Sequence, residues 1–158
     1  MNELRKGIDA SATEALVGTG TETVSRRYRF SPGFIGFSGH FPGNPILPAI
    51  VQIRAVVSLV EEEGGKALRL AAVRSAKFHA PIHPDEDGWI RVRRRIHSGR
   101  DPCDATTPVA GKTVAAFHLE LADEEDHRCE RAMPRPKEEI RSRARPRPPA
   151  PHAVESSA

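Results

Sequence analysis

The sequence predicts an α+β fold in which a curved antiparallel sheet wraps around one long central helix. A single segment, 49–63, is apolar on nearly every side, and the segments after it alternate as strands do. Turns rich in Pro, Asp and Gly separate these later segments, which is typical of an antiparallel meander. The chain has 158 residues, 38% hydrophobic and 28% charged, so it is long enough for one soluble domain with its own core.

Composition divides the chain into three parts. Residues 1–20 are small and polar and form a lead-in or a short helix, 21–133 form the domain, and 134–158 form a tail. The tail holds six Arg or Lys residues against three acidic ones, so it carries the whole net charge of +3, and it holds six of the 14 prolines. We expect it to be disordered, because without Leu or Phe it cannot bury enough apolar surface to offset its ordering.

Several classes of protein are not expected from this composition. No apolar run approaches the roughly 20 residues that cross a bilayer, and the N-terminal stretch lacks the apolar core of a secretory signal. We therefore expect a cytoplasmic protein without membrane contact. Cys103 and Cys129 form no CxxC pair, so neither a disulfide framework nor a zinc cluster is expected. The run RSRARPRP in the tail is expected to be a solvated extension, since no aromatic residue is interleaved to stack on bases, and nucleic-acid binding is the alternative.

The first expected strand covers 21–30, where Val24, Tyr28 and Phe30 share one face. The segment 31–48 that follows holds four prolines and four glycines, so it is predicted to be a loop.

The central helix is expected over 49–63. Pro48 suits its first turn, where a missing N–H costs nothing, and Gly64 and Gly65 end it. The strand-like runs after it are 68–79, 88–97, 113–122 and 128–133. In the third of these runs, the face expected to be buried carries Ala115, Phe117, Leu119 and Leu121.

The densest candidate site is GHFPGNPILPA, residues 39–49. Its prolines stiffen the chain just before the helix, so it can hold His40 against a cleft, and an imidazole titrates near neutral pH. The first backbone N–H groups of the helix, around Ala49, lack intrahelical partners and favour negative charge. A histidine base beside such donors suits removal of a proton next to a carbonyl, because charge then grows on the oxygen. A plain structural loop histidine is the alternative.

Three segments in order resemble the 3-hydroxyacyl-acyl-carrier-protein dehydratases of the FabA/FabZ type. GHFPGNPILPAIVQI is similar to their His-Phe-Pro-Gly signature, KFHAPIHPD at 77–85 to a downstream Phe-and-Pro motif, and HRCERA at 127–132 to their last strand. The resemblance covers roughly 21–133 and implies the hotdog fold. It also implies a lyase without metal or other cofactor, which dehydrates 3-hydroxyacyl thioesters of acyl carrier protein or coenzyme A to trans-2-enoyl thioesters, in fatty-acid or related acyl-chain biosynthesis.

The resemblance assigns roles to individual residues. His40 matches the histidine that removes the C2 proton, and Ala49 matches a glycine whose backbone N–H polarises the thioester carbonyl. Alanine keeps that N–H. The residues implied to bind substrate are Phe41, Pro42, Gly43 and Pro48.

Arg54 departs from the family pattern, because it stands where the family has the acid that handles the leaving hydroxyl. Arginine stays protonated far above neutral pH and is not a practical general acid. We expect it to orient the hydroxyl, with the proton coming from His40 or water and with weakened activity. Arg54, Ser58 and Glu61 share one helical stripe, so an ion pair or a subunit contact is the alternative.

The resemblance further implies a homodimer, or a multiple of dimers, with active sites at the interface. A degenerate dehydratase that binds acyl carrier without turnover is the alternative function, and a thioesterase is a third, supported by fold analogy alone. Arg91, Arg93 and Arg95 share one strand face, which is either solvated or a docking patch for an acidic carrier. His79 and His83 lie too far apart in an extended segment to chelate a metal.

Overall fold

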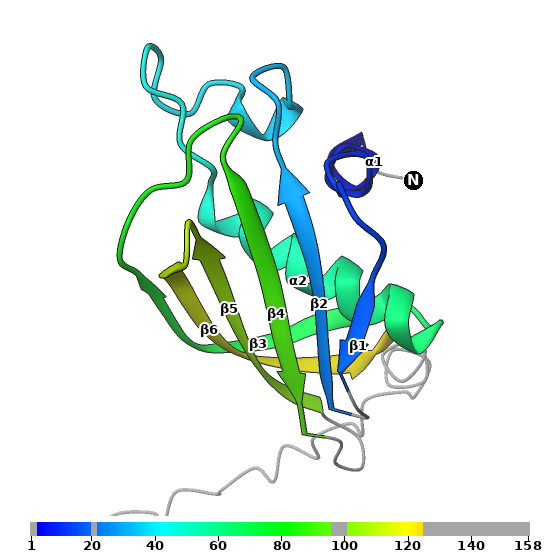
Figure 1. Ribbon diagram of the computed structural model, residues 1–158. Coiled ribbons are helices and arrows are strands. Elements are labelled where there is room, and N and C mark those ends of the chain that lie inside the picture. Colours follow the sequence, from blue (N-terminus) through cyan, green and yellow to red (C-terminus); the bar gives the residue numbers. More distant parts are fainter. Residues whose placement is uncertain (1–2, 20–21, 96–100, 125–158) are drawn as a thin grey trace, which may run out of the picture.

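The computed structural model describes residues 3–19, 22–95 and 101–124. The elements are α1 (Glu3–Ala10), β1 (Val17–Thr19), β2 (Thr23–Arg29), the 3-10 turn η1 (Ile35–Phe37), α2 (Ala49–Gly64), β3 (Leu68–Phe78), β4 (Asp87–Arg94), β5 (Asp101–Val109) and β6 (Lys112–Asp123). The strands form one antiparallel sheet in the order β1-β2-β4-β5-β6-β3, and this sheet curves around α2 (Figure 1). The predicted helix-in-a-curved-sheet arrangement is therefore present.

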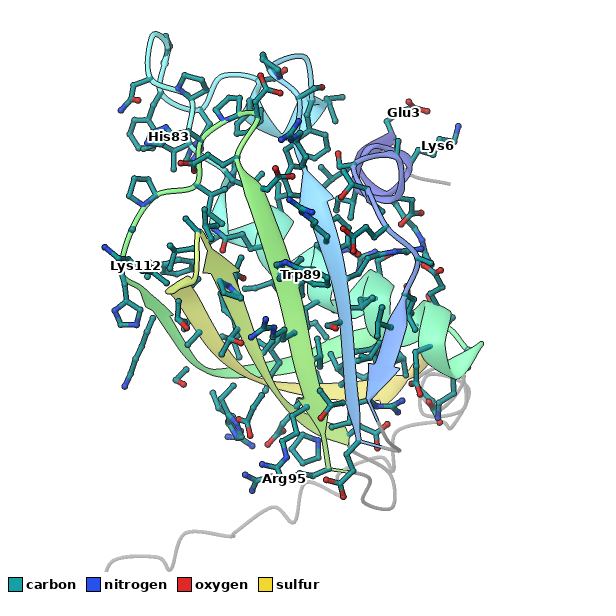
Figure 2. All side chains as sticks on the ribbon, in the orientation of Figure 1. Glu3, Lys6, His83, Trp89, Arg95 and Lys112 are labelled. Carbon is teal, nitrogen blue, oxygen red and sulfur yellow. The ribbon has the colours of Figure 1, made fainter. Side chains whose placement is uncertain are left out.

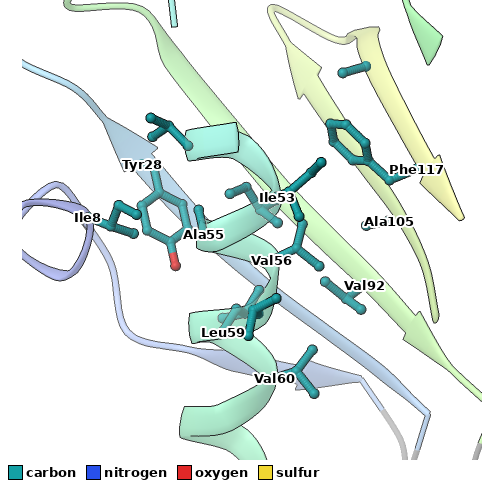
Figure 3. Close-up of a cluster of buried hydrophobic side chains, with 14 of the residues drawn as sticks. Ile8, Tyr28, Ile53, Ala55, Val56, Leu59, Val60, Val92, Ala105 and Phe117 are labelled. Carbon is teal, nitrogen blue, oxygen red and sulfur yellow. The ribbon is translucent and has the colours of Figure 1, made fainter. Parts of the chain in front are cut away.

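Helix α2 forms the centre of the core and is covered from several directions. Figure 3 shows its apolar side chains packed among residues from α1, β2, β4, β5 and β6. Its fully covered residues are Ala55, Val56, Val57, Leu59 and Val60. Burying each Val or Leu stabilises the fold by about 1.5–3 kcal/mol, so the helix is held by packing rather than by its β-branched sequence. It ends where expected, with Gly65 in the left-handed conformation at φ 65°.

Strand β6 confirms the predicted face. Ala115, Phe117, Leu119 and Leu121 are all buried, and the residues between them from Ala116 onward are partly exposed. The strand expected over 128–133 and the tail 134–158 lie outside the described residues, as do residues 96 and 97 at the end of the strand expected over 88–97.

Strand β5 is not among the predicted strands, because the Pro and Asp residues of its segment indicate a turn. The strand tolerates its two prolines through their positions: Pro102 is its second residue, and Pro108 coincides with a shift in register against β6. Between them Cys103, Ala105 and Thr107 alternate as buried residues. Burial raises the pKa of the Cys103 thiol to about 12, so this cysteine serves packing rather than thiolate chemistry.

Helix α1 folds onto the one polar stripe of α2. Ser58 Oγ donates a hydrogen bond to Asp9 Oδ1 at 2.8 Å, and Arg5 Nη1 pairs with Glu61 Oε2 at 2.9 Å. The lead-in thus contains a short helix, α1, followed by strand β1. Helix α1 covers two of the three residues of the stripe and leaves Arg54 uncovered. No helix in the described part of the chain is long and apolar enough to span a membrane.

Replacing Glu61 is expected to loosen the α1–α2–β3 junction. Its buried carboxylate accepts the Leu68 N–H at 2.8 Å, and without it that buried N–H loses its partner. We expect Glu61→Ala to lower the free energy of unfolding by about 1–3 kcal/mol in urea denaturation. Glu3→Ala makes the same change at an exposed helix position and should have little effect. Equal stability of the two variants would contradict this role.

Candidate active site

The loop that carries His40 is shaped by a run of left-handed residues. Gly39 has φ 72°, Phe41 has φ 56° and Gly43 has φ 84°, so the chain reverses on both sides of the histidine. For a residue with a side chain, such as Phe41, this conformation costs about 1–2 kcal/mol. Backbone strain of this kind persists only where the surroundings enforce it, and it concentrates at functional sites.

An aromatic cluster supports this loop from below. The Phe34 ring contacts the rings of Phe30 and Phe37, with centroids 4.9 and 5.8 Å apart. Short turns connect this cluster to the loop, and in the last of them the His40 N–H donates a hydrogen bond to the Phe37 oxygen at 3.1 Å. The position of His40 therefore depends on a packed, buried base.

The segment between β3 and β4 holds the loop from the side. The Leu47 N–H donates to the Ile82 oxygen at 2.8 Å, and His83 Nδ1 lies 3.1 Å from the Pro45 oxygen. Figure 2 shows His83 beside this loop. The downstream motif thus braces the candidate site. His83 is used in this contact, and the described residues contain no group of three or more side chains placed to hold a metal.

A cleft of about 360 Å³ lies between the loop and the start of α2. Its walls comprise His40, Ile46, Leu47, Pro48, Ala49 and Gln52 on one side and residues 78–81 on the other. The first helical hydrogen bonds run from the N–H groups of Val51 and Gln52 to the Pro48 oxygen, at 3.1 and 3.2 Å. The Ala49 N–H precedes them and therefore has no partner within the helix. One chain therefore brings His40, Pro48 and Ala49 together.

Three of the expected substrate contacts lie elsewhere. Phe41, Pro42 and Gly43 line a second hollow, also about 360 Å³, on the other side of the loop, and His40 borders both hollows. The Phe41 ring meets the His40 ring edge-on with centroids 4.6 Å apart, and Phe41 is 57% exposed. Phe41 thus flanks the histidine rather than lining the cleft by the helix.

Arg54 does not reach this cleft within one chain. It follows Gln52 by two residues, a turn of about 200° around the helix, so it faces a different side. There it is half-buried and has no hydrogen bond or ion pair among the residues the structure describes. Ile50, one turn earlier on the same stripe, is 56% exposed. This part of α2 is an open surface with an uncompensated cation.

Gln52 is a further candidate residue that the sequence motifs did not indicate. It lies between apolar residues in the first turns of α2, is 4% exposed and lines the cleft with His40. A glutamine within an otherwise apolar run was the available signal, because buried amides need partners.

The arginine face of β4 is exposed and partly neutralised. Arg93 lies 3.9 Å from Glu22, and Arg95 lies 3.4 Å from Asp104. Figure 2 shows Arg95 at the end of β4 far from His83. The acidic neighbours favour a solvated face over a carrier-docking patch, although Arg91 is exposed without such a neighbour among the described ion pairs.

Comparison with known families decides the identity of the domain. The family model described as ApeI-like, ApeI dehydratase, matches residues 18–104, more than half of the chain. The chain belongs to the ApeI-like dehydratase family. The structure is similar to the dehydratase heterocomplex ApeI:P from Xenorhabdus doucetiae, with a TM-score of 0.62 at 17% identity over 68% of this chain and 94% of that one. This confirms the hotdog fold.

Curated relatives of this ApeI-like chain are similar in sequence over the same region. The 3-hydroxyacyl-[acyl-carrier-protein] dehydratase FabZ of Lactobacillus helveticus is 28% identical over 102 residues, which cover 58% of this chain and 64% of that protein. The FabZ of Chloroflexus aggregans is 36% identical over 94 residues, 54% of this chain and 65% of that protein. The match thus spans somewhat less than two thirds of their length. The resemblance to the FabA/FabZ type is confirmed.

Replacing Gly36 is expected to disturb the base of the His40 loop. A Cβ at this position would lie 2.3 Å from one edge of the Phe34 ring. The other edge of the ring lies close to Gly7, where a Cβ would be only 2.8 Å away, so the ring has little space into which to shift. We expect Gly36→Ala to lower the free energy of unfolding by about 1–3 kcal/mol in urea denaturation. Gly33→Ala meets open space and is the control. If Gly36→Ala leaves the free energy of unfolding unchanged, Phe34 does not fix the loop.

Proposed function

We propose that this chain dehydrates 3-hydroxyacyl thioesters, bound to acyl carrier protein or coenzyme A, to trans-2-enoyl thioesters in fatty-acid or related acyl-chain biosynthesis. The observation that carries the proposal is the cleft in which His40 faces the first turn of the buried helix α2, in a chain of the ApeI-like dehydratase family.

In the proposed reaction His40 removes the C2 proton of the substrate. Negative charge grows on the thioester oxygen, and the Ala49 N–H, at the positive end of α2, stabilises it. The C3 hydroxyl then leaves as water after it receives a proton from the His40 imidazolium or from a water molecule. Atoms and charge balance with one histidine, because the proton taken from C2 returns to the leaving oxygen.

We further propose a homodimer formed through the edge of the sheet at β3. The second half of β3, from Val73 to Phe78, is exposed, and both of these apolar side chains face solvent. An exposed apolar edge strand is a template for pairing with another chain. On the neighbouring helix surface Ile50 is exposed and Arg54 is half-buried. In such a dimer Arg54 of a second copy approaches the cleft and orients the substrate hydroxyl, since a guanidinium only donates hydrogen bonds.

The second candidate is a degenerate module that binds acyl carrier or acyl thioester without turnover. Arg54 favours it, because the chain has no acid at the position where the family has one. Loss of one general acid typically lowers the rate by about 10²–10⁴-fold. Only a measurement of turnover therefore distinguishes a weak enzyme from an inactive binding module.

Hydration of a trans-2-enoyl thioester, followed by loss of enone absorbance, tests the dehydratase. We expect turnover by the wild type, a loss of at least about 10²-fold in His40→Ala, and a smaller loss in Arg54→Ala. His118→Ala is the matched control, because His118 pairs with Asp104 on β5, away from the cleft. If the wild type turns over neither carrier-linked nor coenzyme-A-linked substrate, the enzyme proposal fails. Equal binding of acyl carrier by the wild type and His40→Ala would then support the binding module. Release of free thiol from the substrate would instead support a thioesterase.

Two valines of equal exposure test the dimer. Val73 on the β3 edge and Val17 on the opposite edge of the sheet are each 44% exposed. We expect Val73→Lys to convert the dimer to monomers in analytical ultracentrifugation, because a charge at a buried apolar interface is costly. Val17→Lys should leave the dimer intact. Dissociation by Val17→Lys alone would place the interface at β1 instead.

A further inference from the structure

Gln52 carries an unusual polar group for its position. The residue is 4% exposed, and its side-chain Nε2 donates to the Leu47 oxygen at 3.2 Å. Its Oε1 is buried without a hydrogen-bond partner among the described residues. Burying an amide oxygen without a partner destabilises the fold, so a reason for keeping it is expected.

The orientation of this amide is fixed by its surroundings. The Leu47 oxygen is an acceptor, and the same residue's N–H is already bonded to the Ile82 oxygen at 2.8 Å. Turning the amide over would place Oε1 against the Leu47 oxygen, with two acceptors facing each other. Oε1 therefore remains available to a donor on the other side.

The same cleft holds a second unsatisfied atom. His40 Nδ1 is buried and has no hydrogen-bond partner within the described part of the chain. Both residues line the cleft beside Pro48 and Ala49. A neutral imidazole carries its proton on one nitrogen and a lone pair on the other, so Nδ1 can be a donor. One contact between a protonated Nδ1 and the Gln52 oxygen would satisfy both atoms.

We propose that Gln52 is a positioning residue for His40: when the imidazole turns toward the fixed amide of Gln52 in the cleft, Oε1 accepts a hydrogen bond from Nδ1–H. The bond selects the tautomer whose Nε2 carries the lone pair, which is the form needed to remove a substrate proton. When Nε2 is protonated, the same amide oxygen stabilises the imidazolium, because its partial negative charge still faces Nδ1–H. The effect of this bond on catalysis rests on the proposed function, whereas its effect on the His40 tautomer is independent of that function.

The tautomer is measured directly by ¹⁵N NMR of histidine-labelled protein, at a pH high enough for the imidazole rings to be neutral. The His40 signals are identified by their loss in His40→Ala. In the wild type we expect a protonated Nδ1 and an unprotonated Nε2. In Gln52→Leu, which has similar volume and no acceptor, we expect a shift toward the Nε2–H form that free histidine prefers.

Gln52→Glu separates positioning from a merely structural role. A carboxylate accepts Nδ1–H as the amide does, but it cannot donate to the Leu47 oxygen. We therefore expect Gln52→Glu to keep the wild-type tautomer and Gln52→Leu to lose it, with both variants checked for folding by their amide spectra. If Gln52 only braces Leu47, the two variants change the His40 signals alike, and the proposal is overturned. A wild-type His40 in the Nε2–H form also overturns it.

Kinetics provides the second readout. If the dehydratase assignment holds, we expect Gln52→Leu to lower kcat by about 10–100-fold with little change in KM, as for other residues that orient a functional histidine. Recovery of kcat in Gln52→Glu would distinguish orientation from lost packing. If the wild type shows no turnover, the dehydratase proposal fails, and the NMR result still decides the role of Gln52.

Discussion

Helix α2 has apolar side chains around most of its circumference, and one flat sheet covers only one side of a helix. The chain resolves this by curving a six-stranded antiparallel sheet around α2 and by folding α1 onto the stripe that the sheet leaves uncovered. The twist natural to β-strands makes such curvature accessible. With α2 fixed on these sides, its N-terminus is held firmly at one end of the fold. At that end the 39–48 loop places His40 beside the first turn of α2.

The polar residues of α2 show how the covering of the helix and the site are related. Ser58 and Glu61 find partners within the chain, from α1 and from the Leu68 N–H. Gln52 and Arg54, nearer the N-terminus, are left incompletely satisfied among the described residues. The polar groups in the C-terminal half of the helix are therefore satisfied by contacts within the chain. The N-terminal half keeps unused hydrogen-bonding capacity beside the cleft, which is typical of a site built to receive another molecule.

The sequence was sufficient for those features that depend on local chemistry. The helix was expected over 49–63 and spans Ala49–Gly64, because Pro48 and the Gly64–Gly65 pair mark its ends. The buried face of β6 followed from strict alternation. Strand β5 was not foreseen, since whether Pro102 and Pro108 are tolerated depends on the neighbouring strands rather than on the segment itself. His40, Pro48 and Ala49 could be grouped because they are close in the chain. The separation of Arg54 from His40 and the buried amide of Gln52 required the helical rotation and the packing to be known.

Arg54 has a consequence for how the remaining groups share the proposed reaction. A guanidinium holds a hydroxyl or a water molecule but does not deliver a proton at neutral pH. If neither an acid nor a water molecule takes over this role, the proton that leaves C2 and the proton that reaches the departing oxygen both pass through Nε2 of His40. The C2 hydrogen and the C3 hydroxyl must then lie on the same face of the substrate, within reach of one nitrogen. A histidine with both duties gains more from a fixed tautomer and ring position than one that shares the work with a carboxylic acid. In the proposed mechanism, the arginine at position 54 and the buried amide at position 52 are thus two parts of one arrangement, in which proton transfer is concentrated on His40.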